Sequence, residues 1–140
     1  MSVFISDTAK VEGAATLSDN VRVMGKAKIY GNAKIYGNAK VSDYAKVSGH
    51  AHMSDSAVVE GHAHVYGCAK VFDNATVTYI ARVGDFARVS GSARVGGYAK
   101  VFGRAMVFGN AVVIGISILD GDVTISDGYI RNVHWWRDVP

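Results

Sequence analysis

The chain has 140 residues, enough for one domain, and its 15 Lys and Arg residues against 12 Asp and Glu residues give a net charge of +3. Its single cysteine, Cys68, excludes an intrachain disulfide. No apolar stretch is long enough to cross a membrane, and the first residues lack the basic region and apolar core of a signal peptide. We therefore expect a cytoplasmic protein that does not contact a membrane.

A six-residue phrase, Ala-x-Val-x-Gly-x, runs through the chain and is strict from residue 27 to residue 113. All fifteen strict repeats have Ala in the first position and an aliphatic residue in the third. Followed more loosely from Asp7 to Asp127, Gly or Asp occupies the fifth position in twenty of twenty-one repeats, and Tyr79 is the exception. Residues two apart on a strand point the same way, so Ala and the aliphatic residue face inward and their neighbours face outward.

The period predicts the fold class. Six residues are too few for a strand plus a helix, but they fit one short strand and one tight corner. Gly or Asp turns the chain at each corner, often followed by Asn, which tolerates the left-handed backbone conformation. Three sides close a triangle, so we expect an all-β, single-domain parallel β-helix, a triangular solenoid with about 18 residues per coil and about 6–7 coils.

The chain begins less regularly. Val3 and Ile5 fall in the inward positions of the repeat, so we expect residues 1–8 to form a partial first coil that caps the N-terminal edge. Residues 9–26 then form a looser coil in which Val21 replaces the small residue, and the strict coils follow.

The C-terminal end also departs from the repeat. The phrase relaxes after residue 113 and stops at residue 129. We therefore expect the β-helix to occupy residues 1–128 and a capping tail to occupy residues 129–140. Both tryptophans lie in this tail, and we expect Trp135 and Trp136 to form the C-terminal cap.

One corner is hydrophobic where an outward position should be polar. Residues eighteen apart stack, and the stack at this corner comprises Lys26, Tyr44, His62, Ile80, Tyr98 and Ile116. We expect the tail to fold back over this corner, and the alternative is an interface between subunits.

The run Val71-Phe72-Asp73-Asn74-Ala75-Thr76 resembles the hexapeptide-repeat, left-handed parallel β-helix family. It has, in order, that family's aliphatic residue, outward residue, turn pair, small inward residue and outward residue. The resemblance covers nearly the whole chain and implies a left-handed coil, whereas the general rule for parallel crossovers would give a right hand.

The same resemblance implies an activity. The family's acyltransferases work in a site between subunits of a homotrimer, which here would use acetyl-CoA and either His62 or His64 as general base. The chain departs from those enzymes because its coils run unbroken from residue 9 to residue 128, without the protruding loop that helps to build their pockets. From the residues alone we expect no catalytic residue and no cofactor.

Basic residues favour one outward position of the repeat, which holds eleven of the fifteen Lys and Arg residues. They are shared among all three sides, which favours a solvated surface whose long side chains cover the strands. The densest stack is the best place for an anionic partner such as nucleic acid, and it comprises Lys10, Lys28, Lys46, His64, Arg82 and Lys100.

Large aromatic residues alternate with small residues in two further outward stacks, so the repeat there is two coils long. Exposed aromatic side chains are favoured at protein interfaces. The candidate interaction surface therefore consists of Tyr30, Tyr36, Tyr66, Phe72, Phe102 and Phe108.

Two histidine pairs, His50 with His52 and His62 with His64, lie twelve residues apart, which is two-thirds of a coil. They belong to different corners, so we expect no metal site.

Three functions follow from these patterns. The sequence favours a non-catalytic protein-binding or assembly module that acts through its outer faces, with a protein partner or further copies of itself in a homotrimer or dimer. The first alternative is acyl transfer, which rests on the family resemblance. The second is binding of nucleic acid or another polyanion along the densest basic stack.

Overall fold

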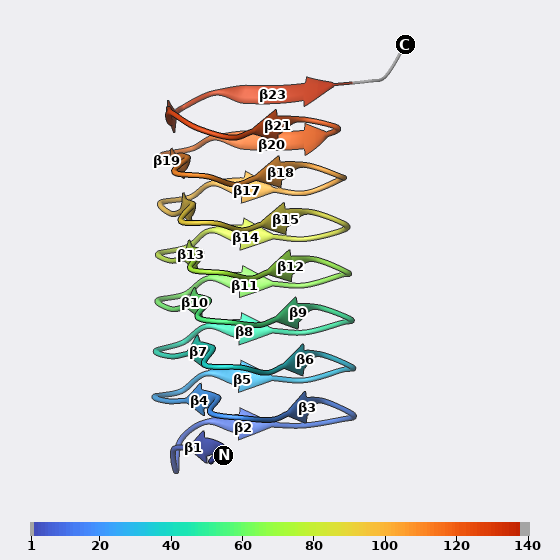
Figure 1. Ribbon diagram of the computed structural model, residues 1–140, viewed down its shortest axis with the longest axis vertical. Helices are drawn as coiled ribbons and strands as arrows, with labels where there is room; N and C mark the ends of the chain where they lie inside the picture. The colour runs from blue at the N-terminus through green and yellow to red at the C-terminus, as the bar shows by residue number, and fades with distance from the viewer. Residues whose placement is uncertain (1, 138–140) are drawn as a thin grey trace.

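The computed structural model describes residues 2–137, and these residues form 23 short strands and no helix. The strands lie in three parallel sheets, which form the three sides of a triangular β-solenoid of about seven coils (Figure 1). None of the described residues forms a helix that is long and apolar enough to span a membrane. The predicted fold class is confirmed.

Each sheet takes every third strand of the chain. Sheet A contains β1 (Phe4–Ile5), β4 (Arg22–Val23), β7 (Lys40–Val41), β10 (Val58–Val59), β13 (Thr76–Val77), β16 (Arg94–Val95), β19 (Val112–Ile114) and β22 (Tyr129–Arg131). Sheet B contains β2 (Lys10–Val11), β5 (Lys28–Ile29), β8 (Lys46–Val47), β11 (His64–Val65), β14 (Arg82–Val83), β17 (Lys100–Val101), β20 (Ile118–Gly121) and β23 (His134–Arg137). Sheet C contains β3 (Thr16–Leu17), β6 (Lys34–Ile35), β9 (His52–Met53), β12 (Lys70–Val71), β15 (Arg88–Val89), β18 (Met106–Val107) and β21 (Thr124–Ile125).

Neighbouring strands pair 18 residues apart, as in β5 and β8, where Lys28 lies opposite Lys46. The backbone N–H of Lys28 donates to the carbonyl of Ala45 at 2.9 Å, and equivalent bonds connect successive coils. Inside the triangle, every inward Ala and aliphatic residue from Val21 to Val113 is fully buried. The alternation of inward and outward residues therefore aligns the outward side chains in columns along the solenoid axis.

The corners explain why the fifth position of the repeat is Gly or Asp. From Gly13 to Gly121 the residues in this position adopt a positive φ, as at Asp43 (φ 61°), and at Gly37 (φ 73°) an added Cβ would lie only 2.8 Å from the backbone nitrogen of Asp55. Where Asp is present, its carboxylate accepts a hydrogen bond from the backbone N–H one coil further on. These residues are Asp19, Asp43, Asp55, Asp73 and Asp85. The exception in the sequence, Tyr79, keeps the same conformation (φ 59°).

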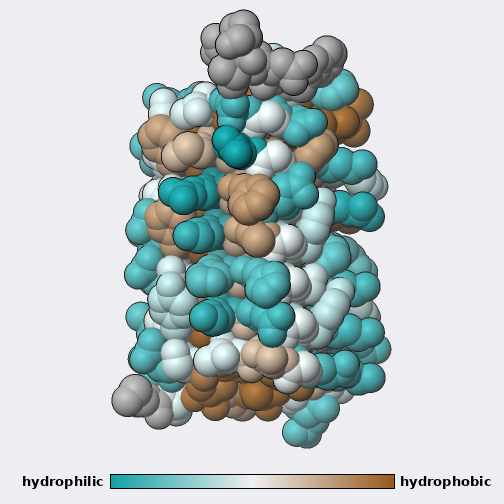
Figure 2. All heavy atoms as spheres, turned by 90° about the vertical axis from the view of Figure 1, so that its right-hand side faces the viewer, coloured by the Kyte–Doolittle hydropathy of each residue, from teal (hydrophilic) through white to brown (hydrophobic). Residues whose placement is uncertain are grey.

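The N-terminal end of the solenoid is open. β1 pairs with β4 in the regular register, so it supplies one side of a coil rather than a cover across the end. Val3 and Ile5 are consequently exposed, and Figure 2 shows hydrophobic surface at this end of the molecule. β1 thus belongs to the first coil, and a capping role for residues 1–8 stays a prediction.

The C-terminal tail continues the stack. β22 pairs with β19 and β23 pairs with β20, but the register shortens: Tyr129 lies opposite Val112, and His134 lies opposite Ile118. In β23, the backbone of Trp135 lies opposite that of Leu119, and the backbone of Trp136 opposite that of Asp120.

The expectation that this tail folds back over the hydrophobic corner is wrong for the described residues. Tyr98 and Ile116 at that corner are 62% and 66% exposed, because β22 and β23 lie on the end of the stack instead of along its side. Residues 138–140 lie outside the described part of the chain.

Candidate functional site

The outer face of sheet B brings three columns of candidate residues side by side. The basic ladder is the stack on the strands themselves, Lys10, Lys28, Lys46, His64, Arg82 and Lys100. The aromatic ladder follows two residues later in alternate coils and consists of Tyr30, Tyr66 and Phe102. The hydrophobic corner precedes the strands by two residues and consists of Tyr44, His62, Ile80, Tyr98 and Ile116.

The basic ladder forms one unbroken register across six coils. All of its Lys and Arg side chains are exposed, whereas His64 is half-buried. Within residues 2–137, none of these five cations forms an ion pair with a carboxylate. Like charges on directly opposite residues of paired strands repel one another, so the ladder is a line of cations that repel their neighbours and have no ion-pair partner among the described residues.

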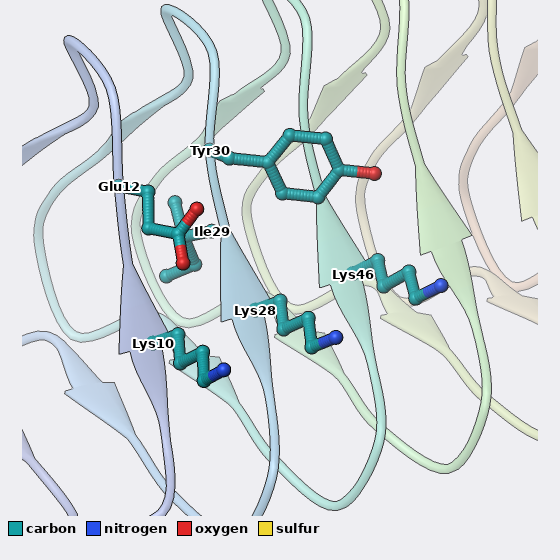
Figure 3. A pocket seen from close by; sticks show the side chains of 6 residues that line it. All are labelled: Lys10, Glu12, Lys28, Ile29, Tyr30 and Lys46. Atoms are coloured by element: carbon teal, nitrogen blue, oxygen red, sulfur yellow. The ribbon is translucent and has the colours of Figure 1, made fainter.

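The N-terminal half of the ladder lines a shallow groove of about 240 Å³. In Figure 3 the side chains of Lys10, Lys28 and Lys46 extend side by side in the same direction, with Glu12 and Tyr30 along one edge. The groove is open to solvent, so a long ligand can enter it from the side and continue along the ladder.

Tyr66 shows how the aromatic ladder packs. Its ring occupies the space that a Cβ on residue 84 would fill, so the ring lies across the backbone of Gly84 in the next coil. At this position the alternation of aromatic and small residues has a packing cause, because Gly84 leaves room for the ring. Tyr66 remains partly exposed, so part of the side chain can be reached from solvent.

His64 belongs to the basic ladder and contacts the aromatic ladder. Its Nε2 lies 3.1 Å from the Oγ of Ser48, and its ring contacts that of Tyr66 with the centroids 5.1 Å apart. Burial, followed by the positive charges of Lys46 and Arg82, lowers the pKa of His64 below its ordinary value. His64 is therefore mainly neutral at neutral pH and interrupts the line of charge.

The hydrophobic corner has two halves. Towards the N-terminus, the Tyr44 and His62 rings stack with their centroids 4.7 Å apart, and the Lys26 ammonium lies 5.6 Å from the Tyr44 centroid. Towards the C-terminus, Ile80, Tyr98 and Ile116 are exposed. These three residues line a groove of about 350 Å³ together with Arg82, Lys100 and Ile118.

The remaining predicted aromatic residues lie elsewhere. Tyr36, Phe72 and Phe108 follow the strands of sheet C, so the two aromatic stacks lie on different sides of the triangle. Sheet C also holds a shorter basic stack that the sequence reasoning did not single out, although the same 18-residue step would have found it. It comprises Lys34, His52, Lys70 and Arg88.

The histidine pairs are likewise separated, since His52 lies on β9 of sheet C and His64 on β11 of sheet B. Among residues 2–137, no three His, Cys, Asp or Glu side chains are placed to hold a metal ion. No protein-family model, curated protein or solved structure matches the chain.

Proposed function

We propose that the protein is a non-catalytic binding module that holds a linear polyanion along the basic ladder of sheet B. The supporting observation is the line of five exposed Lys and Arg side chains, which are in register and have no carboxylate partner within residues 2–137. The ladder extends over roughly 24 Å, at about 4.8 Å per coil. A bound polyanion relieves the repulsion between adjacent cations and releases its own counterions.

The test is the binding of a fluorescently labelled polyphosphate, followed by anisotropy at increasing salt. We expect Lys28→Ser/Lys46→Ser to weaken binding by about tenfold at low salt and to reduce the dependence of affinity on salt. The matched control is Arg22→Ser/Lys40→Ser, which removes two adjacent exposed cations from sheet A. If both variants lose affinity equally, binding follows net charge and the ladder is not a site.

Protein binding, which the sequence ranks first, is the second candidate, and the hydrophobic corner supports it. Tyr98 and Ile116 are mostly exposed, and large exposed apolar groups are typical of interfaces. Light scattering on the wild type and Tyr98→Ser/Ile116→Ser tests self-association as a dimer or homotrimer. A wild-type oligomer that the variant converts to a monomer would support it, and a monomeric wild type would exclude self-association.

The third proposal is acyl transfer. It includes the proposals that the chain belongs to the hexapeptide-repeat family and that its coil is left-handed. One observation favours it: His64 is half-buried, lies within hydrogen-bond distance of Ser48 and is mainly neutral. A histidine must be neutral to act as a general base. Calorimetric titration with acetyl-CoA tests it. If acetyl-CoA does not bind, this proposal fails.

A further inference from the structure

We infer that the polyanion held on sheet B is a single-stranded nucleic acid, with its phosphates on the basic ladder and its bases stacked on the aromatic ladder. This inference rests on the proposed function and adds the identity of the ligand. A polyanion without bases needs only the cations, so the aromatic rings beside them are what would favour a nucleic acid.

The two ladders have the relative position that such a ligand requires. Lys28 and Tyr30, and likewise Lys100 and Phe102, are two residues apart on one coil and both point outward. Two residues of extended strand separate the columns by about 7 Å. A strand whose phosphates follow the cations therefore has its bases on the side of the rings, which is how proteins without sequence preference bind single strands.

The orientation of the rings suits stacking. The Tyr66 ring packs against Gly84 and contacts the His64 ring, but it stays partly exposed, so part of the ring can be reached by a base. Tyr30 is 36% exposed at the edge of the lysine groove (Figure 3). Aromatic faces accept any base, since every base has a π-face of its own.

The shape of the face favours one strand over two. The ladder runs along one of the three parallel sheets of the solenoid (Figure 1), and in the described residues no helix or long loop projects to enter a groove of a duplex. In a duplex the bases stack on one another and cannot reach the rings. Inorganic polyphosphate, which has no ring or apolar surface, would contact the cations but leave the aromatic rings without partners.

The experiment compares three labelled probes by anisotropy: an oligothymidine long enough to span the ladder, the same strand in a duplex with oligoadenosine, and polyphosphate. We expect the wild type to bind the single strand about tenfold more tightly than either of the others. Tyr30→Ser/Tyr66→Ser should abolish this preference and leave polyphosphate binding unchanged. The matched control is Tyr36→Ser/Phe72→Ser on sheet C, which should keep the preference.

The outcomes separate the two proposals. If polyphosphate binds as tightly as the single strand and the sheet B variant changes nothing, the ligand is not a nucleic acid, and the polyanion module stands. If no probe binds at low salt, both proposals fail. Because Tyr66→Ser removes a packed ring, Tyr30→Ser alone is measured beside it and should lose part of the preference with an unchanged circular dichroism spectrum.

Discussion

The interior of the solenoid and the outer face of sheet B follow the same 18-residue step, but they differ in how much the residue type changes from one coil to the next. Inside, every Ala and aliphatic residue from Val21 to Val113 is fully buried, so one coil repeats the next. Outside, neighbours differ, and half-buried His64 lies between the exposed Lys46 and Arg82. Interior residues determine the packing and outer residues meet solvent or ligands, so changes inside should reduce stability and changes outside should reduce binding.

Charged residues show the same division between scaffold and surface. Asp carboxylates at the corners, such as those of Asp43 and Asp73, accept backbone hydrogen bonds from the next coil. The cations of the basic ladder, such as Lys28 and Lys46, have no carboxylate partner among the described residues. The exposed corner carboxylates are thus hydrogen-bonded to the backbone, whereas the cations of the basic ladder are available to a ligand.

Ala69→Leu should give the largest loss of stability. Ala69 is fully buried, and a close-packed interior has no space for three more carbon atoms. We expect the free energy of unfolding to fall by roughly 1–3 kcal/mol or more, measured by chemical denaturation. The control is Lys70→Leu, on the adjacent outward position of β12, which should change it by less than about 0.5 kcal/mol. Equal losses would contradict the division between inside and outside.

Asp73→Ala should have the next largest effect. The variant loses the hydrogen bond from the backbone N–H of Gly91 (3.0 Å) and places Ala at a φ of 58°. We expect a loss of roughly 1–2 kcal/mol in thermal unfolding. Asp73→Gly loses the same hydrogen bond without the backbone strain, so it should cost less. A larger loss for Gly than for Ala would show that the positive φ is not under strain.

Gly84→Ala should disturb the outer face more than the interior. The new methyl group meets the ring of Tyr66, which must swing away. Because this ring is partly exposed, the cost should be only about 0.5–1 kcal/mol, and the single-strand preference should fall with it. In the Tyr66→Ser background the same substitution should cost little. An undiminished cost there would mean that the methyl group strains the backbone and not the ring.

The repeat predicted the fold because the side-chain period of a strand is two. Once Ala and the aliphatic residue were placed inward, the 18-residue step also placed Lys10 and Lys100 in one column, as the register confirms. The spacing predicted which side chains point outward, but not the way in which each of them turns along the sheet. The position of the Tyr66 ring over Gly84, and the contact between His64 and Ser48 of the preceding coil, depend on which way each side chain turns along the sheet.

The C-terminal end was harder to predict for a different reason. The step between paired residues becomes shorter than eighteen at Tyr129 and His134, so extrapolating the period no longer gives the partner of each residue. Because the C-terminal tail and the corner are both hydrophobic, we expected the tail to cover the corner. Backbone pairing of β23 with β20 places the tail on the end of the stack instead. The hand of the coil was implied by the resemblance alone.

The smallest predicted effect is a pH dependence that has opposite signs for folding stability and for polyanion affinity. Burial, Lys46 and Arg82 lower the pKa of His64, so below the ordinary value of about 6.5 the unfolded chain binds a proton more readily than the folded one. Stability should therefore fall as the pH falls from about 6.5 towards the lower pKa of the folded state. Polyanion affinity should rise over the same range, because protonated His64 completes the line of cations.

His64→Gln tests both halves of this expectation. The rise in affinity at low pH should disappear, because the ladder then has no titrating member. The fall in stability should only diminish, since burial and the charges of Lys70, Lys34 and His50 also lower the pKa of His52, which lies on sheet C outside the ladder. Anisotropy and thermal unfolding at several pH values measure the two slopes. If the affinity of the variant still rises on acidification, histidines outside the basic ladder take part in binding, and sheet B is not the whole site.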